Sequence, residues 1–295
     1  MSVRDLGYRA YEGELRPVTQ NTWVMLRYGL WRIWGSWLNR FVVLFFWLPV
    51  AVFVALALIR YAAVGPELPA PPEGVEDGFG AWFVAAPAIW LRSLTGAQFW
   101  FCAALVSIRS GAGVIAEDRT NKAYQFYFAK PVTPAQYLVG RGSALAVFLF
   151  GLIFVPTLLL TLTMVGVGPE EERLTRAGLL LPALLDAAMI SVVLSSLSIS
   201  TSALSKSRAL TITAWVLLLF VPFVLASLVE SIADHEWVYV ISVPGALWNV
   251  GDALYKVEGD WAVLKWFYSA PVLLISTIGG GYGAWLRIRQ AEVIT

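Results

Sequence analysis

A series of long apolar runs, separated by short polar segments, constrains this chain more than any other feature. A helix needs about 20 apolar residues to cross roughly 30 Å of hydrocarbon. Backbone groups in lipid are satisfied only within helices or closed barrels. The runs therefore predict an all-α membrane protein with six transmembrane helices. The predicted spans are Phe41–Ala63, Thr95–Ala116, Leu138–Val167, Gly178–Leu204, Ala209–Ile232 and Phe267–Leu286.

The composition excludes several other classes of protein. Hydrophobic residues make up 58% of the chain and charged residues 14%, too little charge to cover a soluble domain of this length. The net charge of +1 leaves no basic face for nucleic acid. Cys102 is the single cysteine and His235 the single histidine, so neither an intrachain disulfide nor the usual zinc motifs can form. We expect a lipid bilayer as the surroundings, with no bound metal.

Lysine and arginine are distributed unevenly over the predicted loops. If the N-terminus is cytoplasmic, the cytoplasmic segments hold most of these residues, whereas the acidic run Glu170–Glu172 falls outside. The positive-inside rule then predicts a multi-pass protein of the inner (plasma) membrane with both termini in the cytoplasm. The predicted parts are a cytoplasmic and interfacial segment 1–40, a six-span domain 41–295, outer loops 64–94, 168–177 and 233–266, and a cytoplasmic loop 117–137.

The residues before the first span have the periodicity of an amphipathic helix, over Trp23–Arg40. Tryptophan, leucine and isoleucine share one arc, and Arg32, Ser36, Asn39 and Arg40 share the other. Tryptophans flanked by arginines suit the headgroup layer, so we predict a helix lying on the inner membrane surface. The alternative is a plain cytoplasmic extension of the first span.

The last outer loop is unlike a simple linker. It contains two apolar pieces, Val238–Val243 and Ala246–Tyr255, around a Pro-Gly turn. Each is too short to cross the membrane, so we expect them to dip into the outer leaflet or to cap a cavity.

The cytoplasmic loop between the second and third spans is polar and rich in aromatic residues. Glu117–Phe128 lacks proline and glycine, which predicts a helix that continues the second span until Pro131 ends it. Thr133, followed three residues later by Gln136, predicts a capping box at the start of the third span. Four aromatic side chains on the predicted helix have little local protein to pack against, which favours a partner surface over simple contact with lipid headgroups.

This loop resembles one found in the permeases of type-2 ATP-binding-cassette (ABC) transporters. The likeness rests on Ile115–Arg119, on Pro131-Val132-Thr133-Pro134 and on the glycine–basic pair Gly140-Arg141. The family often has glycine where Lys122 stands. The amphipathic entry helix, six spans, cytoplasmic termini and broken last outer loop are also similar to the family's layout.

The resemblance implies that the loop is a coupling helix, which seats in a separate ATPase subunit. The chain has no GxxxxGK[ST] phosphate loop, so ATP and Mg would bind to that partner P-loop ATPase and this chain would not itself be an enzyme. The working unit would contain two permeases, as a homodimer or a heterodimer. The candidate coupling residues are Glu117, Asp118, Arg119, Lys122, Tyr124, Phe126, Tyr127, Phe128, Pro131 and Thr133.

Two ionisable residues, Arg109 and Asp186, lie well inside predicted spans. Such residues are costly in lipid, which makes them candidates for a substrate path, although snorkelling or a buried ion pair would also explain them. Phe220 and Pro222 are further candidates, because a kink at the proline would open a space between two permease copies. The serines of the fourth span favour close helix packing over a polar path.

We expect the membrane subunit of an ATP-driven exporter for an apolar or amphipathic substrate. Two alternatives remain open at this point: a membrane scaffold that uses an ATPase for mechanical work on an envelope machine, and a secondary transporter or channel. The last is disfavoured because intramembrane charges are few and no inverted repeat is visible.

Overall fold

The computed structural model describes residues 20–64, 87–98, 102–121, 123, 132–233, 236–257 and 265–292. These residues form helices and short connections, with no strand among them, which confirms the predicted helical class. Four of the helices are long and apolar enough to cross a membrane: Trp37–Ala63, Pro134–Val167, Glu170–Leu204 and Arg208–Ile232. They correspond to the first, third, fourth and fifth predicted spans. The second and sixth predicted spans are assembled from shorter helical segments.

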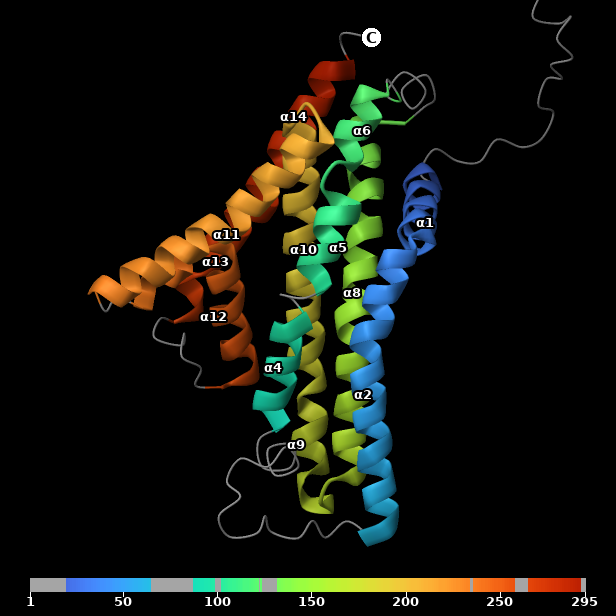
Figure 1. Ribbon diagram of the computed structural model, residues 1–295, viewed down its shortest axis with the longest axis vertical. Helices are drawn as coiled ribbons and strands as arrows, with labels where there is room; N and C mark the ends of the chain where they lie inside the picture. Colours follow the sequence, from blue (N-terminus) through green and yellow to red (C-terminus); the bar gives the residue numbers. More distant parts are fainter. Residues whose placement is uncertain are drawn as a thin grey trace, which may run out of the picture.

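Two antiparallel helices, α8(Pro134–Val167) and α10(Leu180–Leu204), form the centre of the bundle (Figure 1). Helix α2(Trp37–Val64) packs along α8, and α14(Gly280–Glu292) packs against α10. The short helix α6(Val114–Thr120) and the C-terminal part of α14 lie at one end of the bundle, here named the α6 end. The opposite end carries the far end of α2 and α9(Arg173–Gly178).

The second predicted span is not one continuous helix. Its pieces are α4(Pro87–Gln98), α5(Ala104–Val106), the π-helical turn η3(Ser107–Gly111) and α6(Val114–Thr120). The chain leaves helical geometry at Ala112 and Gly113, where Gly113 has a φ of 110°, a value that favours glycine. Helix α6 crosses the predicted end of this span at Ala116, but its helical residues end at Thr120, short of the predicted end at Phe128. Residues 124–128 of the predicted helix lie outside the described residues.

The segment after the fourth span departs from the central bundle. Helix α11(Arg208–Ala233) starts near the α6 end and runs obliquely away from α8 and α10 (Figure 1). The predicted outer loop 233–266 contains η5(Glu236–Ile241) and α12(Val243–Tyr255), two short helices at the two predicted apolar pieces. Helix α12 packs against α10 and α4, so this part of the loop belongs to the protein core.

The remaining short elements lie before α9, in the last predicted span and at the start of α4. The turn η4(Glu170–Glu172) precedes α9. The last predicted span consists of η6(Trp266–Tyr268), α13(Ala270–Leu274), the π-helical turn η7(Ile275–Gly279) and α14, in one helical succession after residue 269. Residues 87–94, predicted as loop, form the first two turns of α4.

The N-terminal helix α1(Gln20–Gly35) is separated from α2 by a break at Ser36. It packs closely on α8, because a side chain at Gly29 would come within 2.6 Å of the Ala144 Cβ. A side chain at Gly140 would similarly come within 2.7 Å of the Met25 Cβ. The tryptophans of the predicted apolar arc are exposed, so they face away from the protein: Trp23, Trp31, Trp34 and Trp37.

Candidate functional site

Helix α6 is fixed at its start by one hydroxyl group of α10. The Ser202 Oγ accepts hydrogen bonds from the backbone N–H groups of Gly113, Ile115 and Ala116, at 3.1, 2.9 and 3.1 Å. These donors belong to the first turn of the helix, where no intrahelical acceptor exists. Ser202 is fully buried, so its removal would leave these donors without an acceptor in the protein interior. Most of the serine run on α10 is similarly buried, as the packing interpretation requires.

The second acidic residue of α6 is part of a buried ion pair. The Arg141 Nη2 donates to Asp118 Oδ2 at 2.6 Å, and the Tyr137 hydroxyl donates to the same oxygen at 2.6 Å. Asp118 and Arg141 are each less than a tenth exposed. The acidic residue and the glycine–basic pair singled out in the sequence therefore lie close together. Gly140 allows α1 to approach α8, and Arg141 links α8 to α6.

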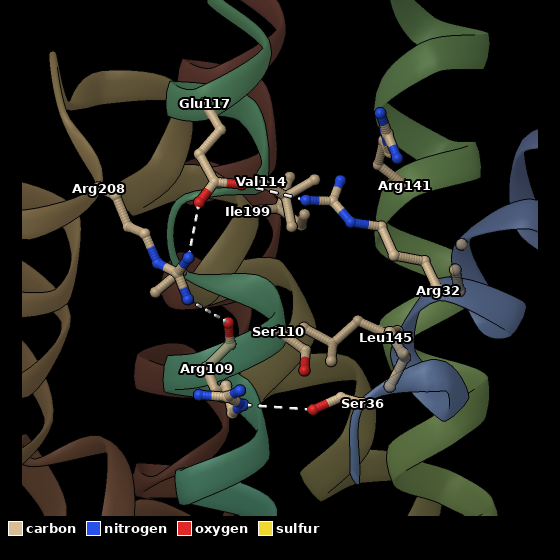
Figure 2. Close-up of a pocket in the computed structure, with 14 residues that line it drawn as sticks. Arg32, Ser36, Arg109, Ser110, Val114, Glu117, Arg141, Leu145, Ile199 and Arg208 are labelled. Carbon is tan, nitrogen blue, oxygen red and sulfur yellow. Dashed lines mark hydrogen bonds and ion pairs between the residues drawn. The ribbon is translucent and has the colours of Figure 1, made fainter. Parts of the chain in front are cut away.

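The first acidic residue of α6 joins two further helices. Glu117 lies between two arginines that reach it from opposite sides (Figure 2). Its Oε2 pairs with Arg32 Nη2 of α1 at 3.1 Å, and its Oε1 pairs with Arg208 Nη1 of α11 at 2.8 Å. All three side chains are partly exposed, so these pairs are individually weaker than the buried one. Adjacent acids thus connect α6 to α1, α8 and α11.

Part of the polar arc of the N-terminal region contacts η3 and α6. Asn39 is buried, and its Nδ2 donates to the Ile33 carbonyl and to Ser110 Oγ, both at 2.8 Å. Ser36 Oγ accepts from Arg109 Nε at 3.4 Å. Arg32, on the same arc, reaches Glu117 of α6, whereas the tryptophans of this region are exposed.

The predicted coupling residues fall into two groups. Glu117, Asp118, the half-buried Arg119 and Thr133 belong to the described residues. Thr133 forms the predicted capping box: its Oγ1 accepts from the Gln136 N–H at 3.2 Å, and its own N–H donates to the Gln136 side chain at 3.1 Å. The other six lie outside the described residues: Lys122, Tyr124, Phe126, Tyr127, Phe128 and Pro131.

A second buried polar cluster joins α4, α10 and α12. Arg92 Nε donates to Asp252 Oδ1 at 2.6 Å, and its Nη1 donates to Asp186 Oδ2 at 3.3 Å. The Thr95 hydroxyl also donates to Asp186 Oδ2, at 2.9 Å. The partner of Asp186 in the structure is thus Arg92, whereas Arg109 reaches Ser36. The sequence does not predict this cluster, because Arg92 and Asp252 both fall in predicted outer loops, outside the predicted spans.

This second cluster contains two acidic side chains and one basic side chain. One guanidinium faces two carboxylates, and all three side chains are buried. The phenol of Tyr255 borders the cluster, and burial raises its pKa, so the hydroxyl stays neutral and adds no charge. The Asp186 Oδ1 has no hydrogen-bond partner among the described residues.

The other candidates for a substrate path lie on α11. Pro222 is inside this helix and half-buried, and Phe220 packs against the main apolar core. The buried face of α11 includes Trp215, whose Nε1 donates to Ser198 Oγ of α10 at 2.8 Å. Its opposite face is apolar and exposed, with Leu217, Val221 and six further aliphatic residues, Leu218, Val224, Leu225, Leu228, Val229 and Ile232.

Within the described part of the chain, no group of three or more His, Cys, Asp or Glu side chains is arranged to hold a metal ion. Neither a scan against protein-family models nor a search of curated proteins finds a match to this chain. The functional interpretation therefore rests on the geometry of the two polar clusters and on the motif in the sequence.

Proposed function

We propose that this chain is the membrane-spanning permease subunit of an ATP-driven ABC exporter for an apolar or amphipathic substrate. In this proposal a separate P-loop ATPase binds ATP and Mg, and a second permease copy completes the transporter. The α6 end faces the cytoplasm of a cell whose inner (plasma) membrane holds the protein, with both termini on that side. Arg32, Arg119, Arg141 and Arg208 belong to segments of this end, as the positive-inside rule requires.

The observation that carries the proposal is the pair of acids at the start of the loop. Glu117 and Asp118 connect α6 to α1, α8 and α11 through three arginines. The far end of the loop enters α8 through the Thr133 capping box. A subunit that pushes on residues 121–132 therefore acts on a segment anchored at both ends to membrane helices, which is what coupling requires.

The structure changes which residues are expected to touch the ATPase. Asp118 is buried against Arg141 and Tyr137, so it positions the loop from within. We assign the direct contact to the aromatic residues between it and Pro131, foremost Tyr124 and Phe128. Charge reversal at Asp118 would test the fold of the loop, whereas substitution of the aromatics tests the interface.

The experiment is co-purification of the full chain with a P-loop ATPase from the same genome, followed by measurement of ATP hydrolysis. We expect Tyr124→Ala with Phe128→Ala to release the ATPase while the permease still elutes as a single species. The control is Tyr28→Ala with Trp31→Ala, which removes two exposed aromatics from α1 at the same end of the bundle. If the Tyr124/Phe128 variant keeps both association and substrate-stimulated hydrolysis, the proposal is wrong.

A further inference from the structure

A pocket of about 170 Å³ opens at the α6 end, between α1, η3, α6, α8 and α11. Four arginines line it, and Glu117 is the one carboxylate among its lining residues. Figure 2 shows three of these arginines, Arg32, Arg109 and Arg208, around Glu117 and η3. The fourth, Arg141, lies on the α8 side.

The positive charge of the pocket exceeds the negative charge that the described residues supply. Glu117 is shared by Arg32 and Arg208, and Asp118 pairs with Arg141. Arg109 is exposed and forms no ion pair with a carboxylate of the described residues. Four guanidinium groups against two carboxylates leave two positive charges. Arg109 keeps most of its donors for a ligand, because the structure assigns only its Nε to Ser36.

Two hydroxyl groups in the wall add neutral donors. Ser36 Oγ accepts from Arg109 Nε, and Ser110 Oγ accepts from Asn39 Nδ2. A hydroxyl that accepts one hydrogen bond retains its own O–H for donation, and both serines line the pocket. The lining therefore offers guanidinium and hydroxyl donors to a single small anion. Guanidinium groups match the geometry of phosphate oxygens, to which they bind in a bidentate manner.

The surroundings of the pocket indicate where such an anion would come from. Exposed tryptophans Trp31, Trp34 and Trp37 flank the same helical region, and tryptophan concentrates at the headgroup level of a bilayer. The pocket also has an apolar part, with Ile33 and Leu145 among its lining residues. Basic pockets between membrane helices at this level suit the headgroups of anionic lipids.

We propose that this pocket binds a phosphate oxyanion, supplied by the headgroup of an anionic phospholipid in the leaflet at the α6 end. The site is distinct from the surface assigned to the ATPase and does not depend on it. Glu117 competes with the phosphate for Arg32 and Arg208, so lipid binding and the ion pairs of α6 oppose each other.

The test uses the purified full chain in detergent, titrated with phosphatidylglycerol or phosphatidylcholine, with bound lipid counted by native mass spectrometry. We expect Arg109→Ala to weaken phosphatidylglycerol binding about tenfold, because it removes a charge-assisted donor without leaving a carboxylate unpaired. Arg109→Lys should retain part of the affinity. Arg27→Ala is the matched control, since Arg27 is exposed on α1 and does not line the pocket.

Glu117→Gln provides a test with the opposite sign and should strengthen phosphatidylglycerol binding. A further arm adds inorganic phosphate at millimolar concentration. Displacement of the lipid, with Arg109-dependent binding of phosphate itself, would assign the site to a soluble phosphate and overturn the lipid source. Equal affinity of the Arg109→Ala, Glu117→Gln and Arg27→Ala variants for phosphatidylglycerol would overturn the site.

Discussion

Substitutions in the buried cluster of Arg92, Asp186 and Asp252 should destabilise the protein by different amounts, and the contacts of each side chain predict their order. Arg92→Met removes the guanidinium that both buried aspartates contact, and no other cation pairs with them among the described residues. Removing one partner of a buried pair costs about 3–5 kcal/mol. For a chain of this size, that loss corresponds to a fall of roughly 10 °C in the unfolding temperature.

The two aspartates are not equivalent. Either Asp→Asn change leaves one carboxylate for the arginine, so neither leaves an uncompensated charge. The Arg92–Asp252 contact is 2.6 Å and the Arg92–Asp186 contact is 3.3 Å. With an effective dielectric constant of about 20, the closer pair is favoured by about 1 kcal/mol. Asp186 is also fully buried, with one oxygen unsatisfied, so its charge is the more costly to hold. We expect Asp252→Asn to destabilise the protein more than Asp186→Asn.

The assay is the temperature at which half of the detergent-solubilised protein is lost from the monodisperse peak after heating. The neutral triple variant Arg92→Met/Asp186→Asn/Asp252→Asn should be more stable than Arg92→Met alone, because it buries no unpaired charge. If Arg92→Met has the stability of the parent chain, or if Asp186→Asn costs as much as Asp252→Asn, this account of the cluster is refuted.

Two further predictions concern the backbone break and the exposed face of α11. Gly113→Ala should cost about 1–2 kcal/mol, since its φ is 110° and a Cβ there would lie 2.8 Å from the Arg208 Cγ. Gly151, in the interior of α8, has open space around a Cβ, so Gly151→Ala should be neutral or stabilising by about 0.5–1 kcal/mol in the same thermal assay. If the two variants lose the same stability, the backbone strain assigned to Gly113 is contradicted. In a Cys102→Ala background, Val221→Cys and Leu225→Cys should form disulfide-linked dimers, because both positions are exposed. The buried Leu219→Cys should not crosslink, and crosslinks from the Ser191–Ser202 face of α10 instead would place the dimer interface elsewhere.

The sequence predicts the long helices well, since hydropathy alone marks a span. It fails at the second span, because its break depends on a tertiary contact. Gly113 adopts its positive φ where Ser202, far along the chain, accepts the N–H groups of the restarted helix. A pattern within one segment carries no information about an acceptor on another helix.

Part of the candidate site is predictable from the sequence. The acid after the second span and the basic residue entering the third are visible as a motif, and Asp118 and Arg141 do pair. The partners of Glu117 are not predictable in the same way, because Arg32 and Arg208 look like ordinary positive-inside residues flanking apolar runs. The burial of Arg92 and Asp252 is not predictable for a related reason: each lies in a helix too short to span a membrane, and its burial follows only from the packing of α4 and α12 on α10.

Both polar clusters contact α10, and this limits which helices the proposed coupling motion can displace. Ser202 holds α6 and Asp186 holds α4, and the two are about 24 Å apart along α10 at 1.5 Å per residue. Both ends of the broken second span are thus fixed to α10 by buried contacts, which are costly to separate. The Glu117 pairs are partly exposed and cost about 1 kcal/mol or less each to break. A push on the loop would therefore release α1 and α11 from α6 before it separated α6 from α8 and α10. In the proposed exporter, the helices that move first are α1 and α11, which form one side of the four-arginine pocket. Helix α11 also carries the exposed apolar face.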